Sequence, residues 1–285
     1  MRLLRHALFA AGLLFCLVSV APAQDAGRIA KSLAAITAAR DNNARRDAIV
    51  GQLRLLGVEP VVEPFGEGRG SGANVVVTLP GSGTRTILVG AHLDRVNVGR
   101  GAVDNGAACA ALIELIAAFK AAPLEHSTLQ IVFFDREEAG LLGSRAFLAG
   151  GHHVDYAVNL DIFAYGNEIF ATSSHSDGRL LRSLRAASDA AGMPLRTVPR
   201  ASYPNSDHVA MMNAGIETLG LALIDTADID GVLAIGGGRL TLGRGPRILT
   251  IIHSPNDTLA EVRTDQMARA IAPVEQLIRA LDLAQ

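Results

Sequence analysis

Four apolar runs along the chain predict buried β-strands. They are Thr86–Gly90, Leu129–Phe134, Tyr156–Phe163 and Arg247–His253. Each run is too short for a membrane-spanning helix and too continuous for a strand with one solvent-exposed face. The segments between the runs have helical patterns. Strands of this kind, alternating with helices, are typical of a mostly parallel sheet covered on both faces. The pattern therefore predicts an α/β fold with a mostly parallel, mixed central sheet between helices.

Amphipathic and alanine-rich segments predict the remaining elements. The helices expected are Asp41–Leu56, Asn105–Lys120, Gly178–Ala191 and Thr264–Leu281, the last one bent at Pro273, and Val58–Pro64 is expected to be an edge strand. A turn at Pro80–Gly83 indicates a hairpin between Asn74–Leu79 and Thr84–Gly90. The segment Asp225–Gly245, with three consecutive glycines, is expected to be a surface loop placed to act as a lid.

The first residues follow the pattern of a secretion signal. Arg2 and Arg5 precede an apolar stretch from Ala7 to Val20, and Ala21-Pro22-Ala23 fits a cleavage site before Gln24. The alternative, a membrane anchor, is disfavoured because the stretch is shorter than the roughly 20 apolar residues that a spanning helix needs. We therefore expect residues 1–23 to be a signal peptide, residues 24–285 to be a single domain, and the protein to be secreted or periplasmic.

Charge and cysteine content narrow the classes further. Without Arg2 and Arg5 the chain has 24 basic and 28 acidic residues, which gives no reason to expect nucleic acid or an anionic membrane as a partner. Cleavage would leave Cys109 as the only cysteine, so an intrachain disulfide would be impossible. We expect a monomer whose fold depends on its core and on any bound metal.

Polar residues of metal-ligand type stand where the apolar runs end. His92 and Asp94 follow the first run, Glu137 and Glu138 the second, and Asp161 and His253 stand late in the third and fourth, with Asp104 in a glycine-containing loop. Each alone has an ordinary alternative, such as a helix cap for Asp104 or an exposed acidic turn for the two glutamates. Because ligands bind at the carboxyl ends of parallel strands, the set as a whole predicts a site.

The spacing of these residues indicates that they have different roles at such a site. A carboxylate at Asp94 can orient a metal-binding His92, and a carboxylate at Asp104 can bridge two metals about 3.5 to 4 Å apart. Because Glu137 and Glu138 are neighbours, their side chains diverge, so that one can bind metal while the other faces a water molecule.

The motifs that carry these residues resemble those of the M28 family of zinc aminopeptidases, in order and in spacing, from about Asn74 to the C-terminus. They read GAHLDRV, AVDNGAACAALIEL, FFDREEAGLLGS, NLDIF, NSDHVAMMNAGI and IIHSPNDT. The resemblance implies a zinc exopeptidase with two zinc ions per chain, acting on peptides that have a free N-terminus. It implies that His92 and Asp161 bind one zinc, that Glu138 and His253 bind the other, and that Asp104 bridges them.

The same resemblance assigns three further roles. Glu137 matches the general base, Asp94 matches the carboxylate that orients His92, and Tyr203, three residues before Ser206-Asp207-His208, matches a tyrosine that stabilises the oxyanion in bacterial leucyl-type members. Those members have cysteines near this loop, whereas this chain has Pro204 and Asn205. The preferred N-terminal residue is left open.

Three alternatives stay open at this point. M20-type carboxypeptidases and deacylases usually place the bridging aspartate farther from His-x-Asp and insert a dimerisation domain, and neither feature is found here. A glutaminyl cyclase of the same fold would use a single zinc, whereas His92 and Asp94 together favour two. A binding ectodomain that has lost its chemistry should lack some ligands, and this chain lacks none.

Overall fold

A computed structural model describes residues 25–236 and 245–284. The predicted signal peptide, residues 1–23, lies outside the described residues. The described part contains one sheet with strands β1 (Val61–Phe65), β2 (Gly72–Leu79), β3 (Thr86–His92), β4 (Thr128–Phe134), β5 (Tyr156–Phe163), β6 (Glu168–Ser173), β7 (Leu195–Val198) and β8 (Glu217–Ile224). Its helices are α1 (Ala26–Thr37), α2 (Asn42–Leu55), α3 (Ala107–Ala121), α4 (Leu142–Ala149), α5 (Arg179–Ala191), α6 (His208–Asn213), α7 (Thr226–Gly236) and α8 (Thr264–Leu283).

The sheet has the strand order β1-β2-β4-β3-β5-β8-β6-β7. Its centre, β4-β3-β5-β8, is parallel, and antiparallel pairs occur toward both edges. The predicted α/β fold with a mixed, mostly parallel sheet is confirmed. The parallel centre directs the carboxyl ends of β3, β4 and β5 to one edge, which is where ligand-type residues were expected.

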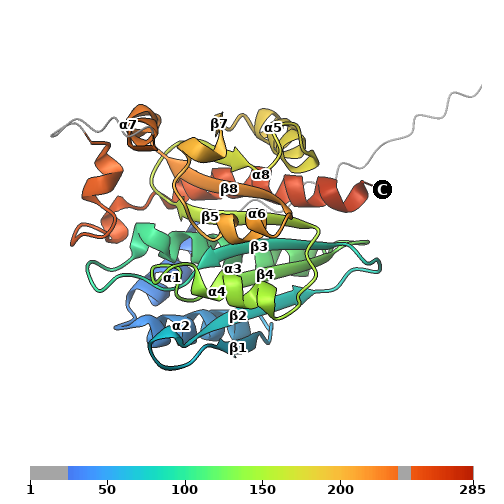
Figure 1. Ribbon diagram of the computed structural model, residues 1–285, viewed down its shortest axis with the longest axis horizontal. Helices are drawn as coiled ribbons and strands as arrows, with labels where there is room; N and C mark the ends of the chain where they lie inside the picture. The colour runs from blue at the N-terminus through green and yellow to red at the C-terminus, as the bar shows by residue number, and fades with distance from the viewer. Residues whose placement is uncertain (1–24, 237–244, 285) are drawn as a thin grey trace, which may run out of the picture.

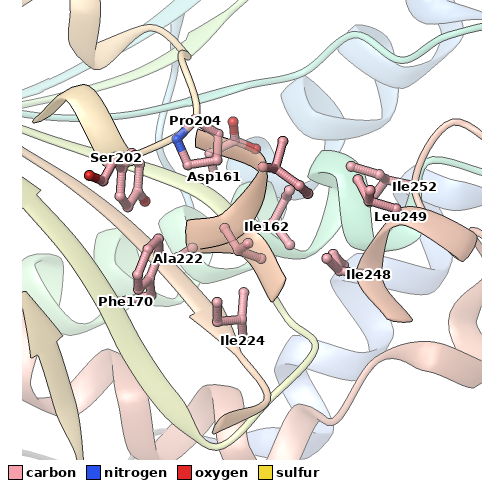
Figure 2. A pocket seen from close by; sticks show the side chains of 13 residues that line it. Asp161, Ile162, Phe170, Ser202, Pro204, Ala222, Ile224, Ile248, Leu249 and Ile252 are labelled. Atoms are coloured by element: carbon pink, nitrogen blue, oxygen red, sulfur yellow. The ribbon is translucent and has the colours of Figure 1, made fainter. Parts of the chain in front are cut away.

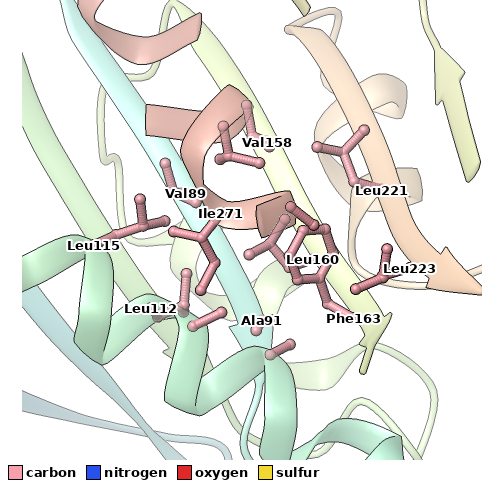
Figure 3. Packing of buried hydrophobic residues seen from close by; sticks show 14 of the residues in the cluster. Val89, Ala91, Leu112, Leu115, Val158, Leu160, Phe163, Leu221, Leu223 and Ile271 are labelled. Carbon is pink, nitrogen blue, oxygen red and sulfur yellow. The ribbon is translucent and has the colours of Figure 1, made fainter. Parts of the chain in front are cut away.

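Alternate residues of the central strands pack on opposite faces of the sheet, as the two-residue period of a strand requires. Val89, Ile131 and Val158 belong to the larger core, which also contains residues of α1, α3 and α8, whereas Leu88 and Val132 belong to a smaller core with residues of α4 and α6. Figure 1 shows the helices on the two sides of the sheet, and Figure 3 shows the larger core. Helices on both faces explain why the strands are apolar without interruption.

Helix α3 is the central buried helix. Together with the π-helical turn before it, Ala102–Ala121 is the one described segment long and apolar enough to cross a membrane, and 94% of it is buried inside the protein. Leu112 and Leu115 of α3 face Val89 and Leu160 of the sheet (Figure 3). Because the segment is buried inside the protein, its high hydropathy is that of a core helix.

The predicted hairpin between Asn74–Leu79 and Thr84–Gly90 is wrong. Strand β4 lies between β2 and β3 and pairs with both. The turn at Pro80–Gly83 instead binds the segment before β4, because the N–H groups of Ser82 and Gly83 donate to the carbonyls of Glu125 and His126. A local turn signal therefore marked a real turn, but not the partner of the strands beside it.

The prediction of a surface loop at Asp225–Gly245 is wrong for the first half of this segment, because Thr226–Gly236 forms helix α7. Gly231 weakens the helical signal in the sequence. In the structure it allows close packing, because a Cβ at Gly231 would lie 2.8 Å from Cβ of Pro246. Residues 237–244 of the expected lid lie outside the described residues.

The strand expected at Arg247–His253 is also absent. Arg247–Thr250 forms a short 3-10 helix that Pro246 precedes, followed by turns. Side chains compete with strand pairing here: the Ser254 hydroxyl donates to the carbonyl of Thr250, and Asn256 Nδ2 donates to the same carbonyl. The other helices and the edge strand β1 are confirmed within a few residues of the predicted bounds.

Candidate metal centre

The ends of β3, β4 and β5 bring four of the predicted site residues to one edge of the sheet. His92 is the last residue of β3, Glu137 and Glu138 follow β4, and Asp161 lies near the end of β5. His92 Nε2 lies 3.5 Å from Oδ1 of Asp161. The strands place these groups through the backbone, so that the site has a rigid base.

Asp104 connects two groups of donors. Its Oδ1 lies 3.2 Å from Nε2 of His92, and its Oδ2 lies 3.1 Å from Nε2 of His253, which is also 3.1 Å from Oε2 of Glu138. In each of the groups His92-Asp104-Asp161 and Asp104-Glu138-His253, the donor atoms lie within 4.8 Å of one another. One carboxylate thus offers a separate oxygen to each group, which is the geometry of a bridging ligand.

Strained backbone places two of these donors. The register of β5 against β8 shifts between Leu160 and Phe163, and Ile162 in this bulge has φ +54°. A positive φ is an outlier for a β-branched residue, and bulges redirect side chains beside active sites. His253 also has φ +54°. Backbone strain of this kind persists only where the surrounding structure enforces it, and here it occurs at a donor and next to one.

Asp94 holds the loop that carries the two glutamates. Its Oδ1 and Oδ2 accept the backbone N–H groups of Glu137 and Glu138 at 3.0 and 3.2 Å. Its carboxylate is 3.5 Å from Nδ1 of His92, and its main-chain carbonyl is nearer, at 3.1 Å. The expected orienting role toward His92 is thus shared between the carbonyl and the carboxylate, and Asp94 has a second role in placing Glu137 and Glu138.

The donor set fits metal cations. Oε1 of Glu138 and Oδ1 of Asp161 are buried and have no hydrogen-bond partner within the described residues. In the same part of the chain, the only cationic side chains paired with Asp94, Asp104, Glu138 and Asp161 are His92 and His253. Buried carboxylates in excess are costly without a counter-charge, and imidazole with carboxylate is a zinc donor set.

The protein shifts the pKa values of these groups strongly. Hydrogen bonding to Asp104 raises the pKa of His253 to about 9. Burial raises the pKa of Glu137 to about 8, with further raising by the charges of Asp161 and Asp207, and burial raises that of Glu138 to about 7. The raised pKa values of the two glutamates show that burial makes their negative charge unfavourable. The raised pKa of His253 shows that neighbouring carboxylates stabilise its protonated imidazole. Divalent cations would stabilise the ionised carboxylates and neutral imidazoles.

An apolar cavity of about 230 Å³ opens beside Asp161 and Tyr203. Figure 2 shows Ile162, Phe170 and Ile224 around it, and Val232 and Ile235 of α7 complete its wall. The Tyr203 ring stacks on Phe170 with centroids 5.1 Å apart. Burial raises the pKa of Tyr203 well above its usual value, so its hydroxyl remains a proton donor at neutral pH.

Two residues without a predicted role position the centre. Asp257 accepts the backbone N–H of Val103 at 2.7 Å and of Asp104 at 3.3 Å. Asn105 donates to the carbonyl of Leu160 and accepts the N–H of Ile162, which joins the Asp104 segment to the bulge. Both residues lie within the recognised motifs, in SPNDT and VDNG, and this placement was the only sequence signal for them.

The structure therefore brings together all the residues that the sequence singled out for the metal site: His92, Asp94, Asp104, Glu137, Glu138, Asp161 and His253. Tyr203 lies at the cavity that adjoins Asp161. Asp207 and His208, also in the motifs, are buried, and their side-chain atoms have no hydrogen-bond partner within the described residues. The His208 ring contacts that of Tyr203 edge-on, with centroids 5.3 Å apart.

The molecule is thus an α/β protein with two overlapping groups of histidine and carboxylate donors at the edge of its mixed sheet. The model of peptidase family M28 matches residues 74–278. The chain belongs to this family.

Relatives and solved structures agree with the family and the fold. The chain is 25% identical over 236 residues to a probable leucine aminopeptidase of Arthroderma benhamiae. The aligned segment covers 78% of this chain and 59% of the relative. An aminopeptidase from Aneurinibacillus sp. strain AM-1 has a similar structure, with a TM-score of 0.73, 13% identity, and coverage of 90% and 93% of the two chains. A glutaminyl cyclase of Porphyromonas gingivalis has a TM-score of 0.71 at 18% identity, with 92% and 100% covered.

These structural likenesses show the fold. The chain spans 41 to 59% of the length of three curated relatives that it matches.

Proposed function

We propose that the chain is a zinc aminopeptidase that removes an apolar N-terminal residue from peptides. The observation that carries this proposal is the pair of oxygens of Asp104, one facing His92 and the other facing His253. Such an arrangement suits two metal ions, whereas a single ion would leave one donor group unused. This favours a two-zinc hydrolase over the glutaminyl cyclase alternative.

His92, Asp161 and Asp104 would hold one zinc, and Asp104, Glu138 and His253 would hold the other. When bound, zinc supplies a Lewis acid that polarises a carbonyl and lowers the pKa of water. Asp94 keeps the neighbouring glutamates in place through their backbone N–H groups.

Glu137 is the base in this proposal. Its carboxyl is partly buried beside the donors and has a raised pKa, so it binds a proton more strongly than an exposed glutamate does. Glu137 takes the proton of the attacking water and passes it to the departing amine. The hydroxyl of Tyr203 donates to the carbonyl oxygen as negative charge develops there.

The apolar cavity selects the side chain of the first residue. It adjoins Asp161, and side chains of Ile162, Phe170 and Ile224 line it. Burying a leucine-sized side chain contributes about 1.5 to 3 kcal/mol, which corresponds to roughly 10- to 150-fold in kcat/KM over glycine. The names of the relatives, leucine aminopeptidase and aminopeptidase, support this assignment.

The test is hydrolysis of aminoacyl-p-nitroanilides by zinc-reconstituted protein. We expect cleavage of the leucyl substrate, slower cleavage of glycyl and aspartyl substrates, and no cleavage of N-acetyl-leucyl-p-nitroanilide. Efficient cleavage of the acetylated substrate would instead favour a deacylase or endopeptidase. Cyclisation of N-terminal glutamine without hydrolysis would favour the cyclase.

A further inference from the structure

A second cavity system, polar and lined by arginines, begins at the other donor group. A cavity of about 280 Å³ is bounded by Glu138, Asp94 and Arg136. A neighbouring cavity of about 390 Å³ is bounded by Arg46, Arg95 and Arg136. The two share Asn42, Arg95, Asn97 and Arg136 as lining residues, so they adjoin and are treated as one region. We call it the arginine cleft.

The arginine cleft and the apolar cavity adjoin different donor groups. The apolar cavity is bounded by Asp161, which belongs to the group with His92, and the arginine cleft is bounded by Glu138, which belongs to the group with His253. A peptide whose first side chain occupies the apolar cavity and whose carbonyl lies at the centre therefore has the arginine cleft available for the chain that follows.

The guanidinium groups of this cleft have no carboxylate partner of their own. Across residues 25–236 and 245–284, neither Arg46, Arg95 nor Arg136 forms an ion pair with a carboxylate, and Arg46 makes no side-chain hydrogen bond. Arg95 is held by the carbonyls of Val96 and Arg40, and its buried Nε has no partner.

Four carboxylates line the cleft, and Asp94 and Glu138 are the two at the candidate metal centre, where Asp94 accepts backbone N–H groups and Glu138 belongs to a donor group. The other two also accept backbone N–H groups. Asp41 caps α2 by accepting the N–H of Ala44 at 2.9 Å. Asp135 accepts the N–H of Ala73 at 2.9 Å and that of Arg136 at 2.9 Å. The wall thus presents three guanidinium groups, and within the described residues none of its four carboxylates forms an ion pair with them. Guanidinium is the side chain best suited to bind a carboxylate through paired hydrogen bonds.

We propose that the arginine cleft binds a carboxylate of the substrate on the C-terminal side of the scissile bond. This inference rests on the proposed aminopeptidase function and adds a substrate class to it: short peptides whose C-terminal carboxylate reaches the cleft, or peptides with an acidic residue at that position. Both sources offer the same group to the arginines. Arg46 is the arginine most available for it, since it has no other partner.

The test compares Leu-Ala, Leu-Ala-Ala and Leu-Ala-Ala-Ala as free acids and as C-terminal amides. Charge-assisted hydrogen bonds predict that kcat/KM for at least one length is about tenfold or more higher for the acid. A second series tests whether an acidic side chain supplies the carboxylate. It compares kcat/KM for Leu-Asp-amide with that for Leu-Asn-amide, and for Leu-Ala-Asp-amide with that for Leu-Ala-Asn-amide. A preference in the first series assigns the C-terminal carboxylate, and one in the second assigns the side chain.

Matched variants locate the effect. Arg46→Gln should reduce the ratio of acid to amide several-fold while leaving hydrolysis of leucyl-p-nitroanilide unchanged, and Arg46→Lys should restore part of the ratio. Arg54→Gln removes the same charge from α2 at an exposed position paired with Glu59, and it should leave the ratio unchanged. Equal rates for acids and amides, and for aspartyl and asparaginyl peptides, in the wild-type protein would overturn the proposal.

Binding separates this proposal from the proposed hydrolysis. Calorimetric titration of the zinc-loaded Glu137→Gln variant with Leu-Ala-Ala and with its amide should show tighter binding of the acid. If the wild-type protein hydrolyses nothing but this difference persists and Arg46→Gln abolishes it, the cleft assignment stands and the aminopeptidase assignment fails. Absence of the difference, with amides hydrolysed normally, rejects the cleft assignment alone.

Discussion

The carboxylate of Asp94 accepts the backbone N–H of Glu137 at 3.0 Å and fixes the start of the loop after β4. Because the same carboxylate also holds the N–H of Glu138, we expect Asp94→Ala to displace both glutamates. Loss of such an outer contact typically costs about 10- to 100-fold in metal affinity or activity. Leucyl-p-nitroanilide hydrolysis and zinc titration should both decline in this variant. Wild-type values for both would reject the positioning role.

Glu137→Gln separates the base from the metal donors. Glu137 belongs to neither donor group, so the amide should leave zinc content almost unchanged while kcat decreases by about 10²- to 10⁴-fold. Metal analysis and steady-state kinetics on the same preparation measure both quantities. A variant that retains full activity would show that another group accepts the proton.

The two donor groups predict how zinc content responds to single substitutions. The wild-type protein should bind about two zinc ions per chain. His253→Ala should leave about one, held by His92, Asp104 and Asp161. His126→Ala changes an exposed histidine whose side chain has no partner among the described residues, and it serves as the control. If inductively coupled plasma analysis gives the same content for His253→Ala as for the wild type, His253 is not a ligand.

Ala222 on β8 lines the apolar cavity, and Figure 2 shows its side chain there. Ala222→Leu should fill part of the cavity and lower kcat/KM for leucyl-p-nitroanilide by about tenfold, with a smaller effect on the alanyl substrate. The ratio of the two substrates is the readout, because a general loss of folded protein lowers both equally. An unchanged ratio would place the specificity elsewhere.

Asp282 near the C-terminus predicts a pH dependence of stability. Its carboxylate accepts the N–H groups of Glu125, His126 and Ser127. Burial raises its pKa, but these hydrogen bonds outweigh burial and lower the pKa overall. A lowered folded-state pKa means that the contribution is present above the unfolded-state pKa, about 4, and is lost as pH falls through the folded-state value.

Asp282→Asn should accordingly destabilise the fold at pH 7 by about 1 to 3 kcal/mol. The difference from the wild type should shrink as pH decreases below about 4. Asp189→Asn, at an exposed position of α5, is the matched control. Urea unfolding at several pH values measures the free energies, and a difference independent of pH would contradict the assignment.

The sequence predicted best those features of the fold and the site that depend on residues close together in the chain. His92, the two glutamates and Asp161 stand where apolar runs end, so strand periodicity and the parallel-sheet rule were enough to place them together. His253 was expected at the end of a strand, but it lies in a strained turn after a short 3-10 helix. Its place beside Asp104 depends on contacts with distant segments, which periodicity does not record.

Other features were beyond local patterns for similar reasons. Strand β4 enters between β2 and β3 because non-local pairing, not the turn at Pro80–Gly83, determines strand order. Helix α7 contains Gly231, which a propensity argument counts against a helix and which packing against Pro246 requires. The arginine cleft combines residues from α2 and from the loops after β3 and β4, and only the folded chain makes them neighbours.

The bulge in β5 has a consequence for altering this protein. Asp161 and Ile162 are adjacent in it, so one strained segment of backbone carries both a candidate metal donor and part of the wall of the apolar cavity. Substitution of Ile162 is therefore expected to displace the carboxylate of Asp161 as well, whereas Ala222 on β8 and Val232 on α7 line the same cavity from segments that carry no candidate donor. Substitutions at those two positions are therefore expected to reshape the cavity without moving a candidate donor.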